Sequence, residues 1–241
     1  EKVTKSPPPL SNIFGNAVSL LADMANSDDL TISSVEVSGD NFAKSRKASS
    51  TRISDAVFYA SNLEQTPIIE QSCIGTCVIE NLTINASERG ISFIDDGHHI
   101  LANSTINAVQ YAVRSDNYGS LSIENTTVKA QYSGIIIRES NSYFLGETTI
   151  EMTDAKSVGL DILGGSHQIG ELRITKTYNN ADITSIGAKF WYTDIALQNV
   201  TTENYSIGLT IRDTEYYADF VGNRGGNSIG TEIIDSSAMI K

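Results

Sequence analysis

The chain has 241 residues, of which 40% are hydrophobic, and carries a formal net charge of −12 at neutral pH. This length allows one or two domains with a large buried core. The acidic balance argues against nucleic acid and anionic lipid as partners, because both require a basic surface. The most apolar segment, within residues 12–26, is too short and too interrupted to span a bilayer, so we expect no membrane insertion of this chain.

Residues 12–26 place apolar side chains at helical spacing, among them Ile13, Phe14 and Leu21. This pattern predicts an amphipathic helix. We therefore assign residues 1–29 to an N-terminal tail and helix, and residues 30–241 to a separate region. That region opens with residues 30–37, whose alternation of apolar and polar side chains predicts a pair of short strands.

Cys73 and Cys77 are the only cysteines in the chain. No histidine or further cysteine lies near them in the sequence to complete a zinc site, and we expect neither a metal nor a cofactor. Two unrelated thiols are the alternative, but their proximity favours a disulfide. Its loop is too short to remove much chain entropy, so it would pin a single turn. A disulfide also indicates an oxidising, extracytoplasmic compartment.

From residue 81 onward the chain repeats. A phrase that opens with Asn or Glu, followed by Thr and a branched apolar residue, recurs at Asn81, Asn103, Asn125, Glu147, Glu171, Asn199 and Asn223. A second marker recurs in step with it at Gly90, Gly134, Gly159, Gly187, Gly208 and Gly230, with Gln110 in the gap. Two markers that keep step at intervals of this size are typical of a solenoid.

The residues after each glycine marker alternate between apolar and polar, as in Ile91, Ser92 and Phe93. This period of two predicts half-buried strands whose buried side repeats from coil to coil. Three short strands in each coil of about 22 residues predict an all-β fold, a parallel β-helix over residues 30–241, and crossover handedness favours the right-handed form.

The helix of residues 12–26 would then cap the first coil or pack on its side. The last coil is incomplete, so we expect further coils or another domain after Lys241.

The recurring asparagines have a structural explanation. A tight turn between strands needs left-handed backbone angles, which Asn tolerates best among residues other than Gly. Stacked coils would place these side chains over one another as a ladder, which we predict for Asn81, Asn103, Asn125, Asn199 and Asn223. Several of these segments also match the N-glycosylation pattern, but a turn ladder beside strand threonines explains them without a sugar.

The repeated phrases "SIG" and "ENTTVKA", the acidic charge, the low lysine content and the close cysteine pair resemble the passenger domains of bacterial autotransporters, of the pertactin-like and AIDA-like adhesin kind. The resemblance covers about residues 30–241 and concerns architecture. It implies display on the bacterial surface, adhesion or self-association, and export in an unfolded state that tolerates only closely spaced disulfides. Similar coils also occur in pectate-lyase-like enzymes and phage tailspikes, so the fold alone does not decide the function.

A polysaccharide-acting enzyme is the alternative function. Cleavage of sugars needs carboxylates as acid and base. The best cluster is "DDGHH" at residues 95–99 with its neighbours on following coils, which gives Asp95, Asp96, Asp116 and Arg138 as the alternative catalytic residues. Most turns are only a few residues long, however, and would not wall a cleft. We therefore interpret "DDGHH" as a solvated turn and predict that the protein is not an enzyme.

Binding is the preferred function. Arginines recur at the fourth place after the glycine marker, and aromatic residues and histidines recur further on, so in register they would form one face suited to glycans or a partner protein. The alternative is that tyrosines simply suit strand edges. The predicted ligand-binding residues are Arg114, Arg138, Arg212, Tyr118, Tyr143, His167, Trp191 and Tyr216.

Overall fold

The computed structural model describes most of the chain between Asn12 and Ile240, and nearly all of it is strand. The described residues are 12–13, 20–23, 29–33, 36–38, 43–46, 50–59, 67–85, 88–116, 118–177, 185–213, 215–224, 229–234 and 237–240. No helix occurs among them, and hence none that is long and apolar enough to cross a bilayer.

The strands form two long sheets. Sheet A contains β1 (Asn12–Ile13), β3 (Asp29–Ser33), β4 (Glu36–Ser38), β6 (Ser50–Tyr59), β8 (Thr76–Asn85), β10 (His98–Ala102), β11 (Thr105–Ala108), β13 (Ser120–Glu124), β14 (Thr127–Ala130), β16 (Asn141–Met152), β18 (Ser166–Lys176), β20 (Asp194–Glu203), β22 (Glu215–Arg224) and β24 (Ser237–Ile240). Sheet B contains β2 (Leu20–Asp23), β5 (Ala43–Arg46), β7 (Pro67–Ser72), β9 (Arg89–Ile94), β12 (Tyr111–Asp116), β15 (Ser133–Arg138), β17 (Val158–Leu163), β19 (Ile186–Trp191), β21 (Ile207–Arg212) and β23 (Ile229–Ile234).

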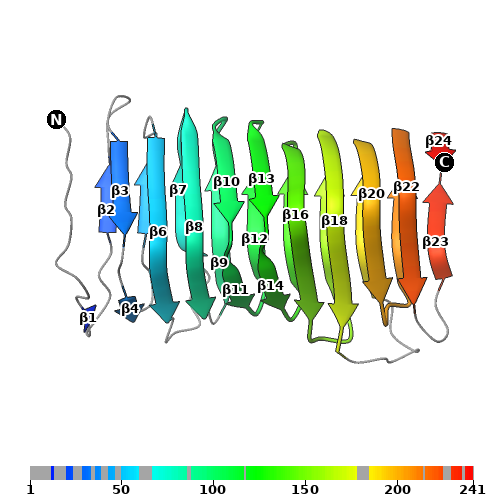
Figure 1. Ribbon diagram of the computed structural model, residues 1–241, viewed down its shortest axis with the longest axis horizontal. Helices are drawn as coiled ribbons and strands as arrows, with labels where there is room; N and C mark the ends of the chain where they lie inside the picture. Colours follow the sequence, from blue (N-terminus) through cyan, green and yellow to red (C-terminus); the bar gives the residue numbers. More distant parts are fainter. Residues whose placement is uncertain are drawn as a thin grey trace.

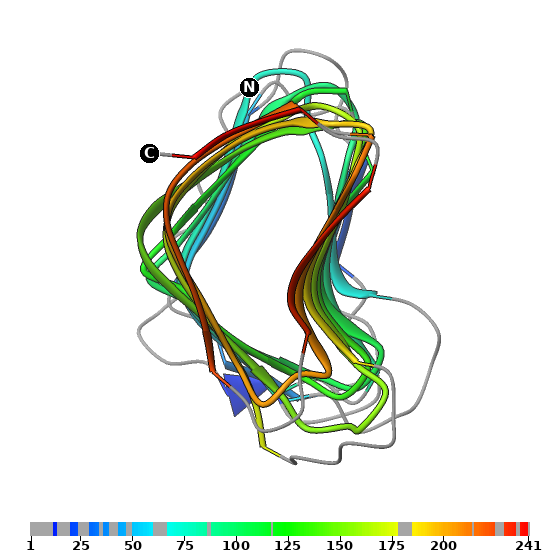
Figure 2. The same ribbon diagram turned by 90° about the vertical axis from the view of Figure 1, so that its right-hand side faces the viewer.

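The chain winds between these sheets as a parallel solenoid. The strands pair in parallel with the equivalent strands of neighbouring coils, those at the ends of each sheet on one side only, and they follow one another along the long axis (Figure 1). In the most regular part, Thr76, His98 and Ser120 stand side by side at steps of 22 residues. An end-on view shows the two walls around a shared interior, with the sheet B wall bending inward (Figure 2). The predicted all-β parallel β-helix with coils of about 22 residues is confirmed.

The interior consists of stacked columns of mostly apolar side chains. Because strand side chains alternate, each strand sends every second residue inward, and the register places it on its equivalent in the next coil. One column of sheet A contains Ile53, Ile79, Leu101, Ile123, Phe144, Ile169 and Leu197. One column of sheet B contains Gln71, Phe93, Ser115, Ile137, Ile162, Phe190 and Ile211. All are buried, so each coil is stabilised chiefly by its two neighbours.

The wall of sheet A bends at a column of left-handed residues. Asp55, Asn81, Asn103 and Asn125 have φ angles of 52°, 51°, 49° and 44°. Asn81 Nδ2 donates to Asp55 Oδ1 at 2.9 Å, and Asn125 Nδ2 donates to Asn103 Oδ1 at 3.4 Å. In the next coil Gly146 takes the left-handed conformation, with φ 67°.

The other two asparagines of the predicted ladder lie elsewhere. Asn199 pairs with Glu171 and Phe220 inside continuous strands, and Asn223 pairs with Thr202, three positions further along. Asn199 has no left-handed φ. The ladder therefore differs from the prediction after Asn125, because the bend of β16 to β22 is made without a left-handed asparagine.

The ladder predicts how substitutions at Asn103 affect stability. We expect Asn103→Ala to lower the free energy of unfolding by about 1–2 kcal/mol, since alanine lacks the short polar side chain that lets asparagine adopt a positive φ. Asn103→Gly removes the same amide but adopts this φ freely, so its loss should be smaller. Urea unfolding of the two variants measures the difference, and equal losses would show that the amide rather than the backbone angle matters.

A column of small residues lies at the start of the sheet B strands. The register places Gly90, Ala112, Gly134, Gly159, Gly187, Gly208 and Gly230 over one another. A Cβ at Gly134 would come within 2.4 Å of the Gly159 carbonyl oxygen, so this column lets neighbouring coils approach closely. Ala112, and not Gln110 as predicted, fills the gap in the glycine series.

The N-terminal region also differs from the prediction. Within residues 12–26, the described parts are the strands β1 and β2, which pair in parallel with β4 and β5. The predicted capping helix is therefore wrong for these residues, and its remainder lies outside the described residues. Over so short a segment, the spacing of the apolar side chains fits an amphipathic helix as well as short strands. Pairing with β4 and β5 favours the strands.

Candidate binding face

One outer surface of the solenoid holds most of the arginines that the sequence singled out. In β15, Ile135 and Ile137 are buried, while the alternating residues Ile136 and Arg138 are partly exposed. The equivalent alternation recurs along sheet B. We call the outward positions of β9, β12, β15, β17, β19 and β21 the sheet B face.

A continuous network of side chains crosses four neighbouring strands of this face. Arg138 in β15 donates to the Asp161 carboxylate in β17 at 2.5 Å, and this carboxylate lies 3.6 Å from Lys189 Nζ in β19. Lys189 Nζ lies 3.8 Å from the centre of a Trp191 ring, and the Arg212 guanidinium in β21 lies 5.4 Å from that ring. These charge-assisted and cation–π contacts orient the network before any ligand binds.

The two preceding strands carry the same residue types. Tyr111 in β12 lies against two guanidinium groups, Arg89 at 5.7 Å and Arg114 at 6.0 Å from its ring centre. Arg89 Nε donates to Gln110 at 2.8 Å, and Arg114 pairs with Asp116 on its own strand. The combination of cations and aromatic rings therefore extends from β9 to β21.

This face is positive although the chain is acidic. Its outward positions hold five cations, Arg89, Arg114, Arg138, Lys189 and Arg212, against two carboxylates, Asp116 and Asp161. A third carboxylate, Asp213, follows β21 directly and lies 3.3 Å from Arg212. The side chains of the last four cations remain between 23% and 44% exposed. The sheet B face thus offers accessible positive charge to an anionic partner that the rest of the molecule would repel.

The three predicted arginines occupy two columns rather than one. Arg138 and Arg212 belong to the column that also contains Asp116, Leu163 and Trp191. Arg114 stands two positions earlier, beside Ile136. The cause is that Ala112, and not Gln110, occupies the glycine column in β12, so every residue of β12 lies two positions away from its predicted place in the register. A shift of two keeps Arg114 on the outer side.

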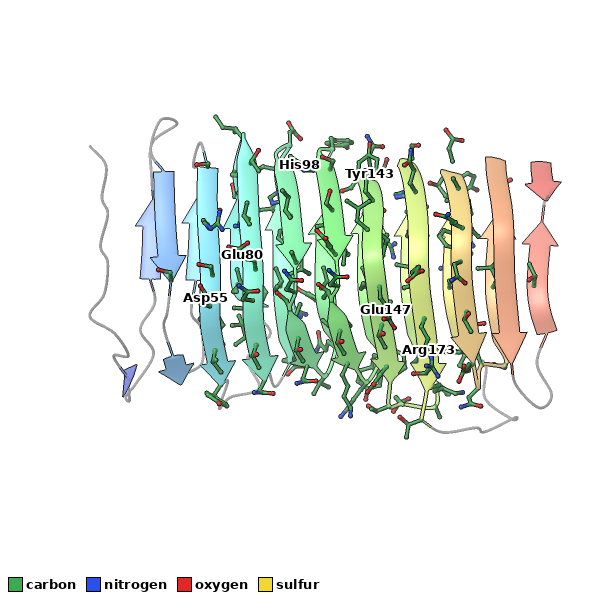
Figure 3. The ribbon with its side chains drawn as sticks, viewed as in Figure 1. Asp55, Glu80, His98, Tyr143, Glu147 and Arg173 are labelled. Atoms are coloured by element: carbon green, nitrogen blue, oxygen red, sulfur yellow. A yellow bond between two sulfur atoms is a disulfide. The ribbon has the colours of Figure 1, made fainter. Side chains whose placement is uncertain are left out.

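The predicted aromatic residues do not share this face, except Trp191. Tyr118 is 79% exposed between β12 and β13. Tyr143 lies in β16, in the wall of sheet A (Figure 3). Tyr216 lies in β22, beside Ile195, and its side chain is outside the described residues.

His167 is a core residue and not a surface ligand. It is 1% exposed, its Nδ1 lies 2.7 Å from Ser142 Oγ, and its Nε2 lies 2.8 Å from the Gly164 carbonyl oxygen. Burial lowers the pKa of His167, while the Gly164 carbonyl and Asp194 act in the opposite direction. The prediction failed because Gly164 and Gly165 turn the chain at positive φ, which resets the alternation of inward and outward residues.

The residues of the alternative catalytic cluster are divided between a corner and the sheet B face. Asp95 has φ 72° and accepts a hydrogen bond from the Ser72 hydroxyl, and Asp96 follows it in the same corner. Equivalent left-handed residues follow other strands of sheet B, namely Glu139, Gly164, Tyr192 and Asp213. Asp95 therefore occupies a recurring backbone position, as expected for a turn. Asp116 and Arg138 lie side by side in one column of the sheet B face.

Two members of the network were not predicted. Asp161 and Lys189 pair with each other across β17 and β19, and Asp161 pairs with Ile136 on the preceding strand. Their position on this face was visible in the repeat, since Asp161 and Lys189 each come two residues after a glycine marker. The sequence interpretation considered only arginines and aromatic rings as ligand-binding residues.

Cys73 and Cys77 form the predicted disulfide, and both are fully buried. Cys77 lies in an inward column of sheet A, with Thr51 on one side and His99 on the other. The histidine that the sequence neighbourhood lacked is therefore supplied by the next coil.

Together, the fold and the sheet B face define a parallel β-solenoid with a basic, partly aromatic lateral surface. No protein-family model matches the chain, and no curated protein matches it.

Proposed function

We propose that this protein is an adhesin of a bacterial cell surface, of the autotransporter passenger type, which binds acidic glycans of host or neighbouring cells along the sheet B face. The observation that carries the proposal is the network from Arg138 to Arg212, which joins cations and an indole ring across four strands. A surface protein with a comparable acidic strip is a second possible partner.

The spacing of the face favours an extended polymer. Neighbouring strands lie about 4.8 Å apart, so a chain that runs along the solenoid axis would meet a cation or a ring at nearly every strand. Guanidinium groups pair with carboxylates or sulfates through two parallel hydrogen bonds. The Trp191 ring offers a flat apolar surface for a sugar ring. Many weak contacts of this kind add up to a useful affinity.

The Cys73–Cys77 disulfide supports a location outside the cytoplasm, because disulfides persist in oxidising compartments. The net charge of −12 supports binding at this one face, since an anionic glycan would be attracted to the sheet B face and repelled by the acidic remainder of the molecule. Adhesion through a repeated surface is also the function that the resemblance to autotransporter passengers implies.

Binding to anionic polysaccharides tests the proposal. We expect the protein to bind hyaluronan or heparin in calorimetric titrations, with an affinity that falls as salt is added. The double variant Arg138→Gln/Arg212→Gln should bind at least about tenfold more weakly, because arginines are among the residues that contribute most of the binding energy at such interfaces. Removal of Arg138 leaves Asp161 paired with Lys189, so the fold should persist.

A matched control separates the face from the overall charge. Arg52 and Arg173 lie in sheet A, where they pair with Glu80 and Glu203 and are 54% and 56% exposed. Arg52→Gln/Arg173→Gln removes the same charge and should change the affinity little. Equal weakening by both double variants, or no binding by the unmodified protein, would contradict the proposal.

The enzyme alternative is tested in the same titrations by following the length of the polymer. The observation that favours it is that Asp116 and Arg138 are neighbours across β12 and β15, on a surface suited to a polyanion. If the polymer is shortened, and Asp116→Asn or Asp95→Asn/Asp96→Asn abolishes the shortening, the protein is a depolymerising enzyme and the adhesin proposal is wrong.

A further inference from the structure

The corner between β7 and β8 brings three potential metal ligands together. Cys73 and Cys77 belong to the turn "CIGTC", and His99 comes from β10, which pairs with β8 so that His99 stands beside Cys77. All three are fully buried, and their sulfur and nitrogen ligand atoms lie within 4.8 Å of one another. The two sulfurs are joined as a disulfide.

His99 differs from the other buried histidine of the chain. Neither of its ring nitrogens makes a hydrogen bond to the residues that the structure describes. His167 lies in the same inward column three strands further on, and both of its ring nitrogens are bonded, to Ser142 and Gly164. A fully buried imidazole without hydrogen bonds requires an explanation, and the two sulfur atoms beside it offer one.

The surroundings of the sulfurs are polar and confined. Gln71 Nε2 donates to Thr51 Oγ1 at 2.5 Å, and Thr51 Oγ1 donates to Cys77 Sγ at 3.0 Å. Gln71 Oε1 is buried and makes no hydrogen bond within the described part of the chain. A Cβ at Gly97 would lie 2.9 Å from Cys73 Sγ, so glycine keeps this side of the sulfur open. Thr51 therefore links Gln71 to the sulfur cluster by hydrogen bonds.

We propose that reduction of the disulfide converts this corner into a site for one Zn²⁺ ion, bound by the Cys73 and Cys77 thiolates and the His99 imidazole. A dithiol supplies two electrons and two protons, so the S–S bond breaks, two thiols form and the dithiol becomes a disulfide. Zn²⁺ then displaces both thiol protons to solvent, and two Zn–S bonds and one Zn–N bond form.

The charge of the complex favours zinc over Cu⁺. Two thiolates neutralise Zn²⁺, so the buried complex carries no net charge, whereas Cu⁺ with the same ligands would bury a negative charge.

Such a site would keep the corner cross-linked in both redox states. In the oxidised protein the link is the disulfide, and in the reduced protein it would be the metal. The zinc link would also tie Cys73 and Cys77 to the next coil, because His99 belongs to β10. Reduction would thus replace a link within one turn by a link between two turns.

Metal titration of the reduced chain tests this inference. The protein is reduced with a phosphine, which takes up one oxygen atom from water as the S–S bond breaks, and is titrated anaerobically with Zn²⁺ against a chromophoric chelator. We expect one equivalent to bind to the reduced protein and none to the oxidised protein. X-ray absorption at the zinc edge should show two sulfur ligands and at least one imidazole nitrogen.

Variants of the histidine complete the test. His99→Phe keeps a ring beside Phe93, and it should weaken binding by at least about tenfold, as expected for a lost ligand. His98→Gln alters the neighbouring, partly exposed residue and should bind zinc as the unmodified chain does. Circular dichroism verifies the fold of each variant. The inference fails if the reduced protein binds no zinc, if His99→Phe binds equally well, or if the absorption spectrum of the unmodified protein shows no imidazole.

Discussion

Replacing Gly159 by alanine should destabilise the protein more than any surface substitution. A Cβ at this position would lie 2.3 Å from Ile174 Cγ2 and 2.6 Å from the Gly187 carbonyl oxygen. The first contact is with the core and the second with the backbone of the next coil, so neither can yield without moving a strand. We expect Gly159→Ala to lower the free energy of unfolding by about 3 kcal/mol or more. Urea unfolding followed by circular dichroism measures this loss.

The neighbouring residue provides the control. Val158 is partly exposed on the sheet B face, and Val158→Ala should cost less than about 1 kcal/mol. An unfolding midpoint for Gly159→Ala that equals that of the unmodified protein would show that the coils have room to separate at this column. Close approach of the strands would then not depend on small residues.

A second large effect is expected in the core of sheet B. Phe190 is fully buried between Ile162 and Ile211 of the adjoining coils. Phe190→Ala should lower the free energy of unfolding by about 3–5 kcal/mol, from lost burial and from the cavity left behind. Because each coil contacts only its neighbours, the cavity also weakens the link between the two parts of the solenoid. The denaturant dependence of unfolding should therefore become shallower as well.

Phe190→Leu separates these contributions. Leucine refills most of the space, so the loss should be about 1.5 kcal/mol with an unchanged denaturant dependence. If the alanine variant is as stable as the leucine variant, the interior is looser than the stacked columns imply.

The solenoid could be predicted from the sequence because the recurring Asn and Gly residues occupy equivalent positions in successive coils. Residues such as Asn81, Asn103 and Asn125 recur at the step of one coil, and backbone pairing makes that step visible. The register of β12 was predicted wrongly by two residues, which places Ala112 in the glycine column instead of Gln110. Alternation with period two is unchanged by such a slip, so the pattern of side chains alone does not reveal it.

The side chains near the corners were harder to place. A left-handed residue such as Asp95 or Gly164 reverses the alternation, so His167 points inward although its distance from the glycine marker indicated the surface. The proximity of Cys77 and His99 could have been predicted from the sequence, since the two are separated by one repeat of 22 residues. It was missed because metal ligands were sought along the chain and not across the coils.

The column that holds His99 and His167 has a further consequence. Its successive members, Cys77, His99, Leu121, Ser142, His167, Ile195 and Tyr216, are separated by steps of 22, 22, 21, 25, 28 and 21 residues, yet they stay in register. Differences in coil length are therefore absorbed between the paired strands, except for one register shift within β16, between Phe144 and Glu147. Such a molecule can acquire or lose surface loops during evolution while its walls stay intact. The longest step, from His167 to Ile195, shows how much extra chain one coil can hold while the strands on either side of it stay paired.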